Sequence, residues 1–197
     1  MGGQVVSLAG TWMQGLAQSW LVYRLTHSTM ALGAIGFAAH LPVLLLSPIA
    51  GLAADRYSRR KMVMWAQSGF LLQACLLAAL TLTNVVTVST VIGMAAVWGI
   101  LNAFDIPGRQ SLYVHLVGKE DLPNAIAINS MTFNAARVIG PSIAGFLVAA
   151  LGEGWCFLVN GLTYVVVLAS LWVMKSDRKS TRLNSSHSAK SRMPSSA

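Results

Sequence analysis

The chain has 197 residues, of which 55% are hydrophobic and only 10% are charged. A soluble domain carries about 25% charged residues, so this chain has too few polar side chains to cover a water-exposed surface. The net charge of +8 does not indicate nucleic-acid binding, because the bases lie at the ends of apolar segments and form no aromatic-interleaved face. Composition therefore predicts an all-α membrane protein.

Six apolar segments follow one another along the chain, at approximately 5–25, 31–54, 62–82, 86–104, 125–151 and 156–174. A helix needs about 20 mostly apolar residues to cross the hydrocarbon core of a bilayer. The first segment is too rich in Gln and Trp for a signal peptide, and it lacks a cleavage site. The pattern predicts six transmembrane helices.

The basic residues between these segments predict the orientation of the chain. Positively charged links stay in the cytoplasm, and only Arg24 falls on the side opposite to the other bases. The bases on the common side are Arg56, Arg59, Arg60, Lys61, Arg109, Lys119 and Lys175. We therefore expect both termini to be cytoplasmic and membrane lipid to surround the helices.

The chain lacks the sequence signatures of enzymes and of cofactor sites. Cys75 and Cys156 lie in apolar segments and have neither a disulfide nor a metal-ligand spacing. No ATP-binding loop, Gly-x-Ser-x-Gly motif or His-Glu-x-x-His motif is present. We expect no enzymatic activity, no cofactor and no bound metal.

The first segment carries a polar stripe at successive helical turns, formed by Ser7, Thr11, Gln14 and Gln18. Uncharged polar groups in a membrane must find partners or a watery cavity. The stripe could line a substrate path, or it could bond to neighbouring helices, as Gln and Ser often do in membranes. Further polar candidates for the cavity are Gln67, Gln73 and Asn102.

Between the second and third segments lies the most charged link, Gly51–Lys61, which contains Asp55, Arg56, Arg59 and Arg60. Asp55 stands four residues before Arg59, a spacing that allows an ion pair on one helical turn. Asp105 and Arg109 repeat this spacing at the end of the fourth segment. Membrane orientation explains the bases, but acids contribute little to it. The two acids therefore favour an additional role.

Arg137 lies about twelve residues into the fifth segment, near the middle of the bilayer. A central Arg costs at least ~2.5 kcal/mol on insertion scales, so its side chain should face the bundle interior or water. It could contact an anionic substrate. It could instead be held by backbone carbonyls, by Asn134 or by a group outside these six segments.

Two other membrane positions have both a functional and a packing interpretation. Gly140, Pro141 and Gly145 thin and bend the fifth segment, and small residues let neighbouring backbones approach closely. His40 precedes Pro42 in the second segment and could relay protons, or it could be a neutral packing residue.

Residues 177–197 differ from the rest because they are Ser-rich, basic and almost without apolar side chains. They could form a disordered cytoplasmic tail. Their codons can also be written as a common sequencing adapter, so we expect a non-native tail after a native region at 1–176. The native protein would then continue beyond residue 176.

Several pieces of the chain resemble one family of transporters. They are Gly10-Thr-Trp-Met-Gln14, Ala17-Gln-Ser-Trp-Leu-Val-Tyr-Arg-Leu-Thr26, the Gly51–Lys61 link, Asn124-Ala-Ile-Ala-Ile-Asn-Ser130 and Asn134-Ala-Ala-Arg-Val-Ile-Gly-Pro-Ser-Ile-Ala-Gly145. With them, residues 1–176 resemble the N-terminal half of a major facilitator superfamily transporter, in the drug and siderophore exporter branch called transmembrane secretion effectors. Ser58 departs from the Gly that is usual in the wider superfamily, and Met1 falls inside the usual first segment.

The resemblance implies twelve helices in two halves, each with inverted three-helix repeats, rocking about a central cavity. It implies a charged latch of Gly51, Asp55, Arg56, Arg59 and Arg60 with Asp105 and Arg109, and a motif at Gly140, Pro141 and Gly145 that seals against leak. Gln14, Gln18, Asn134 and Arg137 would line the cavity. The expected function is proton-coupled export of a small molecule through the bacterial inner membrane. A lipid or lysolipid flippase and a non-transporting six-helix accessory protein are the alternatives.

Overall fold

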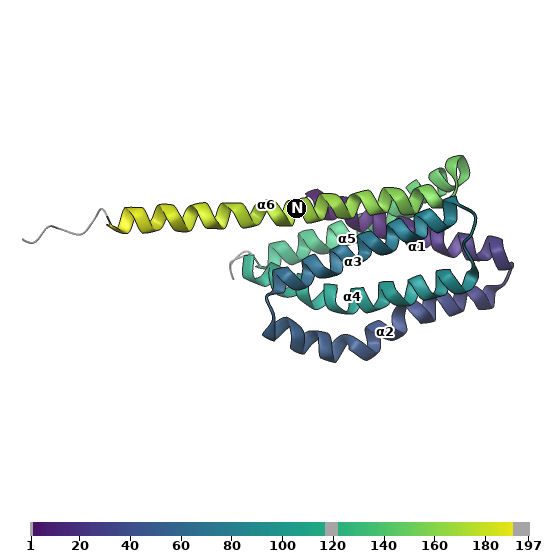
Figure 1. Ribbon diagram of the computed structural model, residues 1–197, viewed down its shortest axis with the longest axis horizontal. Coiled ribbons are helices and arrows are strands. Elements are labelled where there is room, and N and C mark those ends of the chain that lie inside the picture. Colours follow the sequence, from purple (N-terminus) through teal and green to yellow (C-terminus); the bar gives the residue numbers. More distant parts are fainter. Residues whose placement is uncertain (1, 117–121, 191–197) are drawn as a thin grey trace, which may run out of the picture.

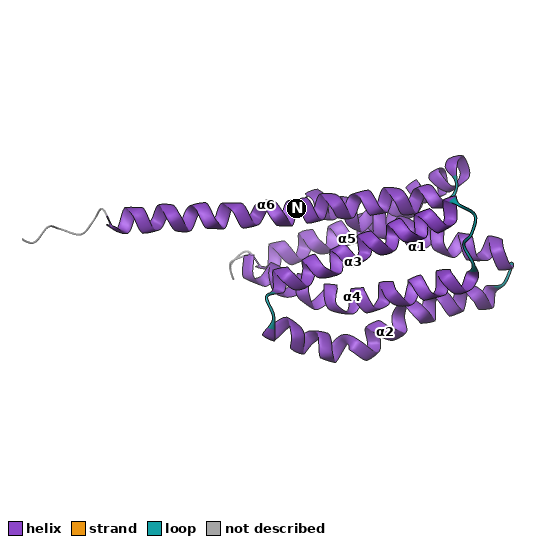
Figure 2. Ribbon diagram, in the orientation of Figure 1, coloured by secondary structure: helices purple, strands orange, loops and turns teal. Residues whose placement is uncertain are grey.

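The structure, a computed structural model, describes residues 2–116 and 122–190 and consists of six helices in that part of the chain. The helices are α1 (Gly2–Thr26), α2 (Thr29–Arg56), α3 (Arg59–Leu82), α4 (Val88–Leu116), α5 (Leu122–Leu151) and α6 (Glu153–Lys190). They run alternately up and down as one bundle (Figures 1 and 2). The predicted all-α architecture with six helices is confirmed.

Five of the described helices, α2 to α6, are long and apolar enough to cross a membrane. The helix outside this group is α1, which has sufficient length but carries the polar stripe of Ser7, Thr11, Gln14 and Gln18. These polar side chains lower the hydropathy of α1, and three of them, Ser7, Gln14 and Gln18, are buried within the bundle instead of facing lipid.

Helix pairing follows an approximate twofold exchange of α1–α3 with α4–α6. When α1, α2 and α3 are exchanged with α4, α5 and α6, the α2–α4 pair corresponds to the α1–α5 pair, and the α3–α4 pair corresponds to the α1–α6 pair. The α3–α6 pair corresponds to itself. One glycine holds each equivalent pair close. A Cβ on Gly99 of α4 would lie 2.2 Å from the carbonyl oxygen of Ala39 in α2, and a Cβ on Gly140 of α5 would lie 2.5 Å from that of Ala9 in α1.

The two ends of the bundle differ in their packing. We call the end with Arg56, Arg59, Arg60 and Arg109 the basic end, and the other the Glu153 end. The largest apolar core lies toward the Glu153 end and includes Leu21, Leu77, Val91 and Phe157 from four helices. At the basic end a smaller cluster of Val63, Val167 and Leu171 joins only α3 and α6. Polar side chains fill more of the space between the helices there.

The last helix continues past the expected boundary at residue 176. α6 runs to Lys190, so part of the segment that we expected to be disordered is helical (Figure 1). Residues 191–197 and Lys119 lie outside the described residues. The non-native origin of 177–197 stays a prediction.

Candidate transport site

A cavity of about 190 Å³ lies between α1, α4 and α5, with α3 and α6 behind it. Four aromatic rings line it, from Phe70, Trp98, Phe133 and Tyr164. Its polar lining includes Ser7, Thr11, Asn102, Asp105, Arg109 and Asn129. We call this cavity the polar hollow. An amphipathic molecule could place a ring against the aromatic side chains and its polar groups against the amides and charges.

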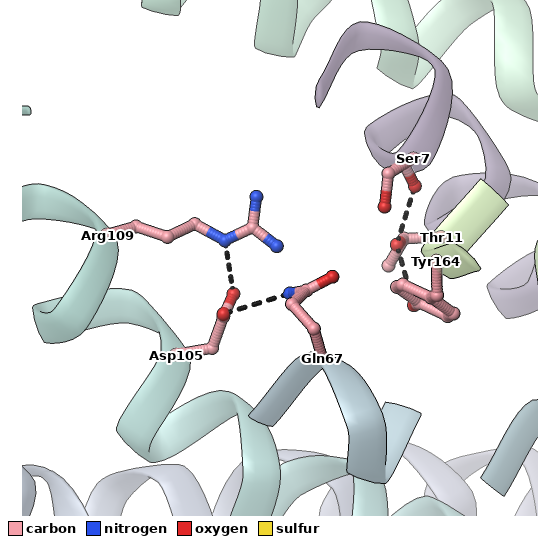
Figure 3. A network of polar contacts seen from close by, with 6 residues as sticks. All are labelled: Ser7, Thr11, Gln67, Asp105, Arg109 and Tyr164. Carbon is pink, nitrogen blue, oxygen red and sulfur yellow. Dashed lines mark hydrogen bonds and ion pairs between the residues drawn. The ribbon is translucent and has the colours of Figure 1, made fainter. Parts of the chain in front are cut away.

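The charged part of the hollow is an ion pair within α4. Asp105 is only 5% exposed, and its Oδ2 accepts a hydrogen bond from Nε of Arg109 at 2.5 Å (Figure 3). Gln67 of α3 donates from Nε2 to Oδ1 of Asp105 at 3.0 Å. The four-residue spacing correctly predicted this pair, and Gln67 adds a second helix. A buried carboxylate is stable in such a place only with partners of this kind.

Two hydroxyl groups form the other side of the hollow. Thr11 donates to the carbonyl oxygen of Ser7 at 2.9 Å, and its Oγ1 lies 3.0 Å from the hydroxyl of Tyr164 (Figure 3). Phe70 stacks on the Tyr164 ring with centroids 5.4 Å apart. Ser7 and Thr11, the N-terminal half of the α1 stripe, therefore border the polar hollow, and Thr11 also contacts α6.

Gln14 and Gln18, the C-terminal half of the α1 stripe, are buried between helices. Gln14 donates to Oε1 of Gln73 at 2.9 Å and accepts from Nδ2 of Asn160 at 2.6 Å. Gln18 donates to the carbonyl oxygen of Val91 at 3.2 Å. These contacts correspond to hydrogen bonding across helices, the second of the two interpretations of the stripe. A cavity-lining role for Gln14 and Gln18 stays a prediction.

The Gly51–Lys61 link does not form the ion pair that its spacing suggested. α2 ends at Arg56 and Tyr57 is extended, with φ −99° and ψ 160°, so Asp55 and Arg59 belong to different helices. Asp55 is exposed and has no ion pair among the described residues. Arg60 instead donates to the carbonyl oxygen of Leu171 in α6.

The two charged regions of the expected latch are nevertheless close in space. A Cβ on Gly108 of α4 would lie 3.1 Å from side-chain atoms of Met62 and Val63, in the first turns of α3. The helix that carries Asp105 and Arg109 therefore packs against the helix that begins with Arg59 and Arg60. Arg56 and Gly51 lie beside them near the end of α2, with Arg56 exposed and nothing within 4 Å of a Cβ on Gly51.

The remaining predicted positions lie on α5 and α2. Arg137 is exposed, and its guanidinium carbon lies 5.6 Å from the centroid of the Trp12 ring. Asn134 is exposed and donates to the carbonyl oxygen of Ser130 in its own helix, so it does not hold Arg137. His40 is exposed on α2 and bonds to the Gly36 carbonyl oxygen of its own helix, outside the hollow.

The three helix-packing residues of α5 have different surroundings. Gly140 is buried against α1, since a Cβ there would also lie 2.7 Å from Cβ of Trp12. Nothing lies within 4 Å of a Cβ on Gly145, which is exposed. Pro141 lies inside α5 without ending it. Close packing in this motif is therefore due to Gly140.

Sequence analysis missed Asn160 and Tyr164. Asn160 is fully buried, and its Nδ2 also lies 3.4 Å from the hydroxyl of Tyr164. A Cβ on Gly10 would lie 2.3 Å from Oδ1 of Asn160, so α1 meets α6 at a glycine there. The available signal was the clustering of Asn160, Thr163 and Tyr164 on one face of an otherwise apolar helix, at the three- and four-residue spacings that place side chains together.

A family model described as transmembrane secretion effector matches residues 3–191, nearly the whole chain. The chain belongs to this transporter family. Transmembrane secretion effectors are transporters of the major facilitator superfamily and not enzymes, so this chain is part of a multi-pass membrane transporter.

Curated relatives agree with this assignment. The chain is 31% identical to the staphyloferrin A transporter of Staphylococcus aureus over 160 residues, which cover 81% of this chain and 40% of the relative. It is 27% identical to the enterobactin exporter EntS of Shigella flexneri over 172 residues, covering 84% and 41%. It is 24% identical to the uncharacterized transporter YfiS of Bacillus subtilis over 181 residues, covering 90% and 42%. The chain thus spans about two-fifths of these relatives. No solved structure matches it.

Proposed function

We propose that this chain is the N-terminal six-helix half of a secondary transporter that exports a small siderophore-class molecule across the bacterial inner membrane, coupled to proton antiport. The observation that carries the proposal is the family match over residues 3–191 together with two relatives named for siderophore transport. Because the chain spans about 40% of those relatives, a second half of similar size would complete the twelve helices.

The polar hollow supports the substrate part of the proposal. Aromatic, amide and hydroxyl side chains line it from α1, α3, α4, α5 and α6, together with the partly buried Asp105–Arg109 ion pair. Pockets for small molecules combine apolar walls with a few fixed polar groups in this way. With a volume of about 190 Å³, this half could enclose one ring or side group of a larger substrate.

The charges at the basic end support a gating role. In the proposal, the basic end is cytoplasmic, and Arg56, Arg59 and the exposed Asp55 contact the second half when the cavity opens outward. Asp105 and Arg109 keep the end of α4 packed beside them. Asp55 has no ion-pair partner among the described residues, which leaves its carboxylate available to a base elsewhere in the transporter.

A secretion assay tests the proposal. The complete coding sequence that contains residues 1–176 is expressed in a bacterium that makes enterobactin but has lost its own enterobactin exporter, and in a staphyloferrin A producer without its exporter. We expect secretion of at least one siderophore to be restored and to fall when an uncoupler dissipates the proton gradient. The Trp65→Leu variant, which changes an exposed side chain outside the hollow and the charged link, should secrete normally.

Three results would count against the proposal. Neither siderophore being secreted would reject the substrate class, and secretion that persists after the gradient collapses would reject proton coupling. Outward movement of a fluorescent lysolipid without siderophore release would favour the flippase alternative.

A further inference from the structure

Arg137 is a charge at the middle of α5 that the proposed function has not yet explained. It lies half-way along α5 and is exposed on the surface of the six-helix unit. In the described part of the chain its guanidinium group forms no ion pair and no hydrogen bond. A charge at this depth costs at least ~2.5 kcal/mol on insertion scales, so residues of this kind pair with another group or face water.

Trp12 of α1 holds the guanidinium group in place. The guanidinium carbon lies over the indole ring, 5.6 Å from its centroid. Phe133, one turn before Arg137 on α5, packs edge-on against the same indole at 5.6 Å and 76°. Gly140, one turn after Arg137, lies against Cβ of Trp12. The indole is therefore fixed between two turns of α5.

The contact with Trp12 leaves the hydrogen-bonding capacity of Arg137 unused. A cation–π contact contributes about 0.5–2 kcal/mol, less than the cost of placing a charge at this depth in a membrane. The contact is made to the ring face and uses none of the five N–H donors of the guanidinium group. These donors are arranged to bind a carboxylate with two parallel hydrogen bonds.

The acids of the described side chains do not supply this carboxylate. Asp105 pairs with Arg109, Glu153 pairs with Arg24 at 2.9 Å, and Asp55 lies at the basic end of α2. Among the described side chains, the acid closest to the centre of a helix is Asp105 of α4, and it is already paired with Arg109. No described side chain therefore neutralises Arg137, which leaves water, a ligand or another part of the transporter as its partner.

We infer that Arg137, Trp12 and Phe133 form an anion subsite, which binds a carboxylate or similar anionic group of the exported molecule. Arg137 donates the hydrogen bonds, Trp12 orients the guanidinium group, and Phe133 offers an apolar edge. Phe133 also lines the polar hollow, so the subsite adjoins it and one ligand can occupy both. This inference rests on the proposed function, because it specifies the charge of the transported molecule.

Transport kinetics of the complete transporter in inside-out vesicles provide the first test. For the siderophore that is secreted, Arg137→Gln should raise KM roughly 10- to 100-fold, as the loss of a charged hydrogen-bonded contact does. Arg137→Lys should retain part of the affinity, because the charge remains without the planar fork. Trp12→Leu should raise KM several-fold, and Trp12→Phe should restore most of it. Trp65→Leu, on an exposed side chain outside the subsite and the charged link, serves as the matched control.

A binding measurement on the purified complete transporter keeps the two proposals distinguishable. Enterobactin and staphyloferrin A are each added, and the shift in thermal unfolding temperature is compared between the unmodified transporter and Arg137→Gln. A shift that depends on Arg137 supports the anion subsite even if secretion fails. Normal KM in Arg137→Gln, with secretion intact, overturns the subsite and leaves the proposed function standing. Absence of both transport and an Arg137-dependent shift overturns both.

Discussion

Helices α1 and α5 pack against each other and both carry polar side chains at helical spacing, but they use them differently. In α1, Ser7, Gln14 and Gln18 are buried, and the two Gln side chains bond to neighbouring helices. In α5, Asn129, Ser130, Asn134 and Arg137 are exposed. The polar side chains of α1 thus hold neighbouring helices together inside the bundle, whereas those of α5 are accessible to a partner or a ligand.

This difference shows that polarity alone does not identify a substrate path. Each polar group in a membrane needs a partner, and the informative quantity is whether the same bundle supplies it. The described side chains supply partners for Gln14 and Gln18, but no acid among them pairs with Arg137. Substitutions can test that distinction, and the largest effect is expected at Gly140, where α1 and α5 meet.

The largest effect is expected from Gly140→Val. Its side chain would enter space that the Ala9 carbonyl oxygen and Cβ of Trp12 already occupy, so α1 and α5 would have to separate. We expect loss of the folded, monodisperse chain in size-exclusion chromatography in detergent. Gly145→Ala is the matched control and should elute as the unmodified chain does, because no atom lies within 4 Å of the added Cβ.

The next effect concerns the two acids near the basic end. Asp105→Ala removes the counter-charge of Arg109 and the acceptor of Gln67, which should destabilise the chain by about 2–4 kcal/mol. Asp55→Ala should leave the unfolding free energy unchanged, because Asp55 is exposed and unpaired in the described residues. Unfolding in mixed micelles with increasing SDS measures both. Equal losses in the two variants would contradict the assignment.

A smaller loss is expected within the α1 stripe. Gln14→Leu leaves Oε1 of Gln73 and Nδ2 of Asn160 without this partner and should cost about 1–2 kcal/mol. The double variant Gln14→Leu, Asn160→Leu should lose less than the sum of the single variants, because the two residues share one hydrogen bond. Additive losses, measured by the same unfolding method, would show that the side chains act independently.

The smallest effect is expected on the α5 face. Asn134 bonds only to a carbonyl of its own helix, so Asn134→Ala should change the unfolding free energy by less than about 0.5 kcal/mol. If this variant lowers transport while stability is unchanged, the α5 face participates in function. A stability loss as large as that of Gln14→Leu would remove the contrast between the two helices.

Much of the fold was predictable because a bilayer imposes long apolar segments separated by charged links. The predicted segments coincide with the six helices, but hydropathy predicts only the membrane-embedded part of each helix and not where the helix ends. The fourth segment was expected to end near residue 104, and α4 continues to Leu116. The Asp105–Arg109 pair stabilises this polar extension as a helix, which an apolar pattern could not indicate.

Within the site, local pairs were easier to predict than contacts between helices. Asp105 and Arg109 meet because one helix fixes their spacing, whereas Asp55 and Arg59 do not because the helix ends between them. The contact between Asn160 and Gln14 joins residues 146 positions apart and depends on how α1 packs on α6. The Trp12 contact with Arg137 likewise depends on the close approach at Gly140.

The distance along the chain between Gln14 and Asn160 has a consequence for biosynthesis. The ribosome adds about 5–20 residues per second, so Gln14 is synthesised roughly 7–30 s before Asn160. During that interval α1, the described helix that is not among the candidate membrane spans, lacks its hydrogen-bond partner in α6. We expect α1 to remain beside the translocon or an insertion chaperone until α6 has been synthesised. Stable insertion of the first helix would then depend on the arrival of the last one.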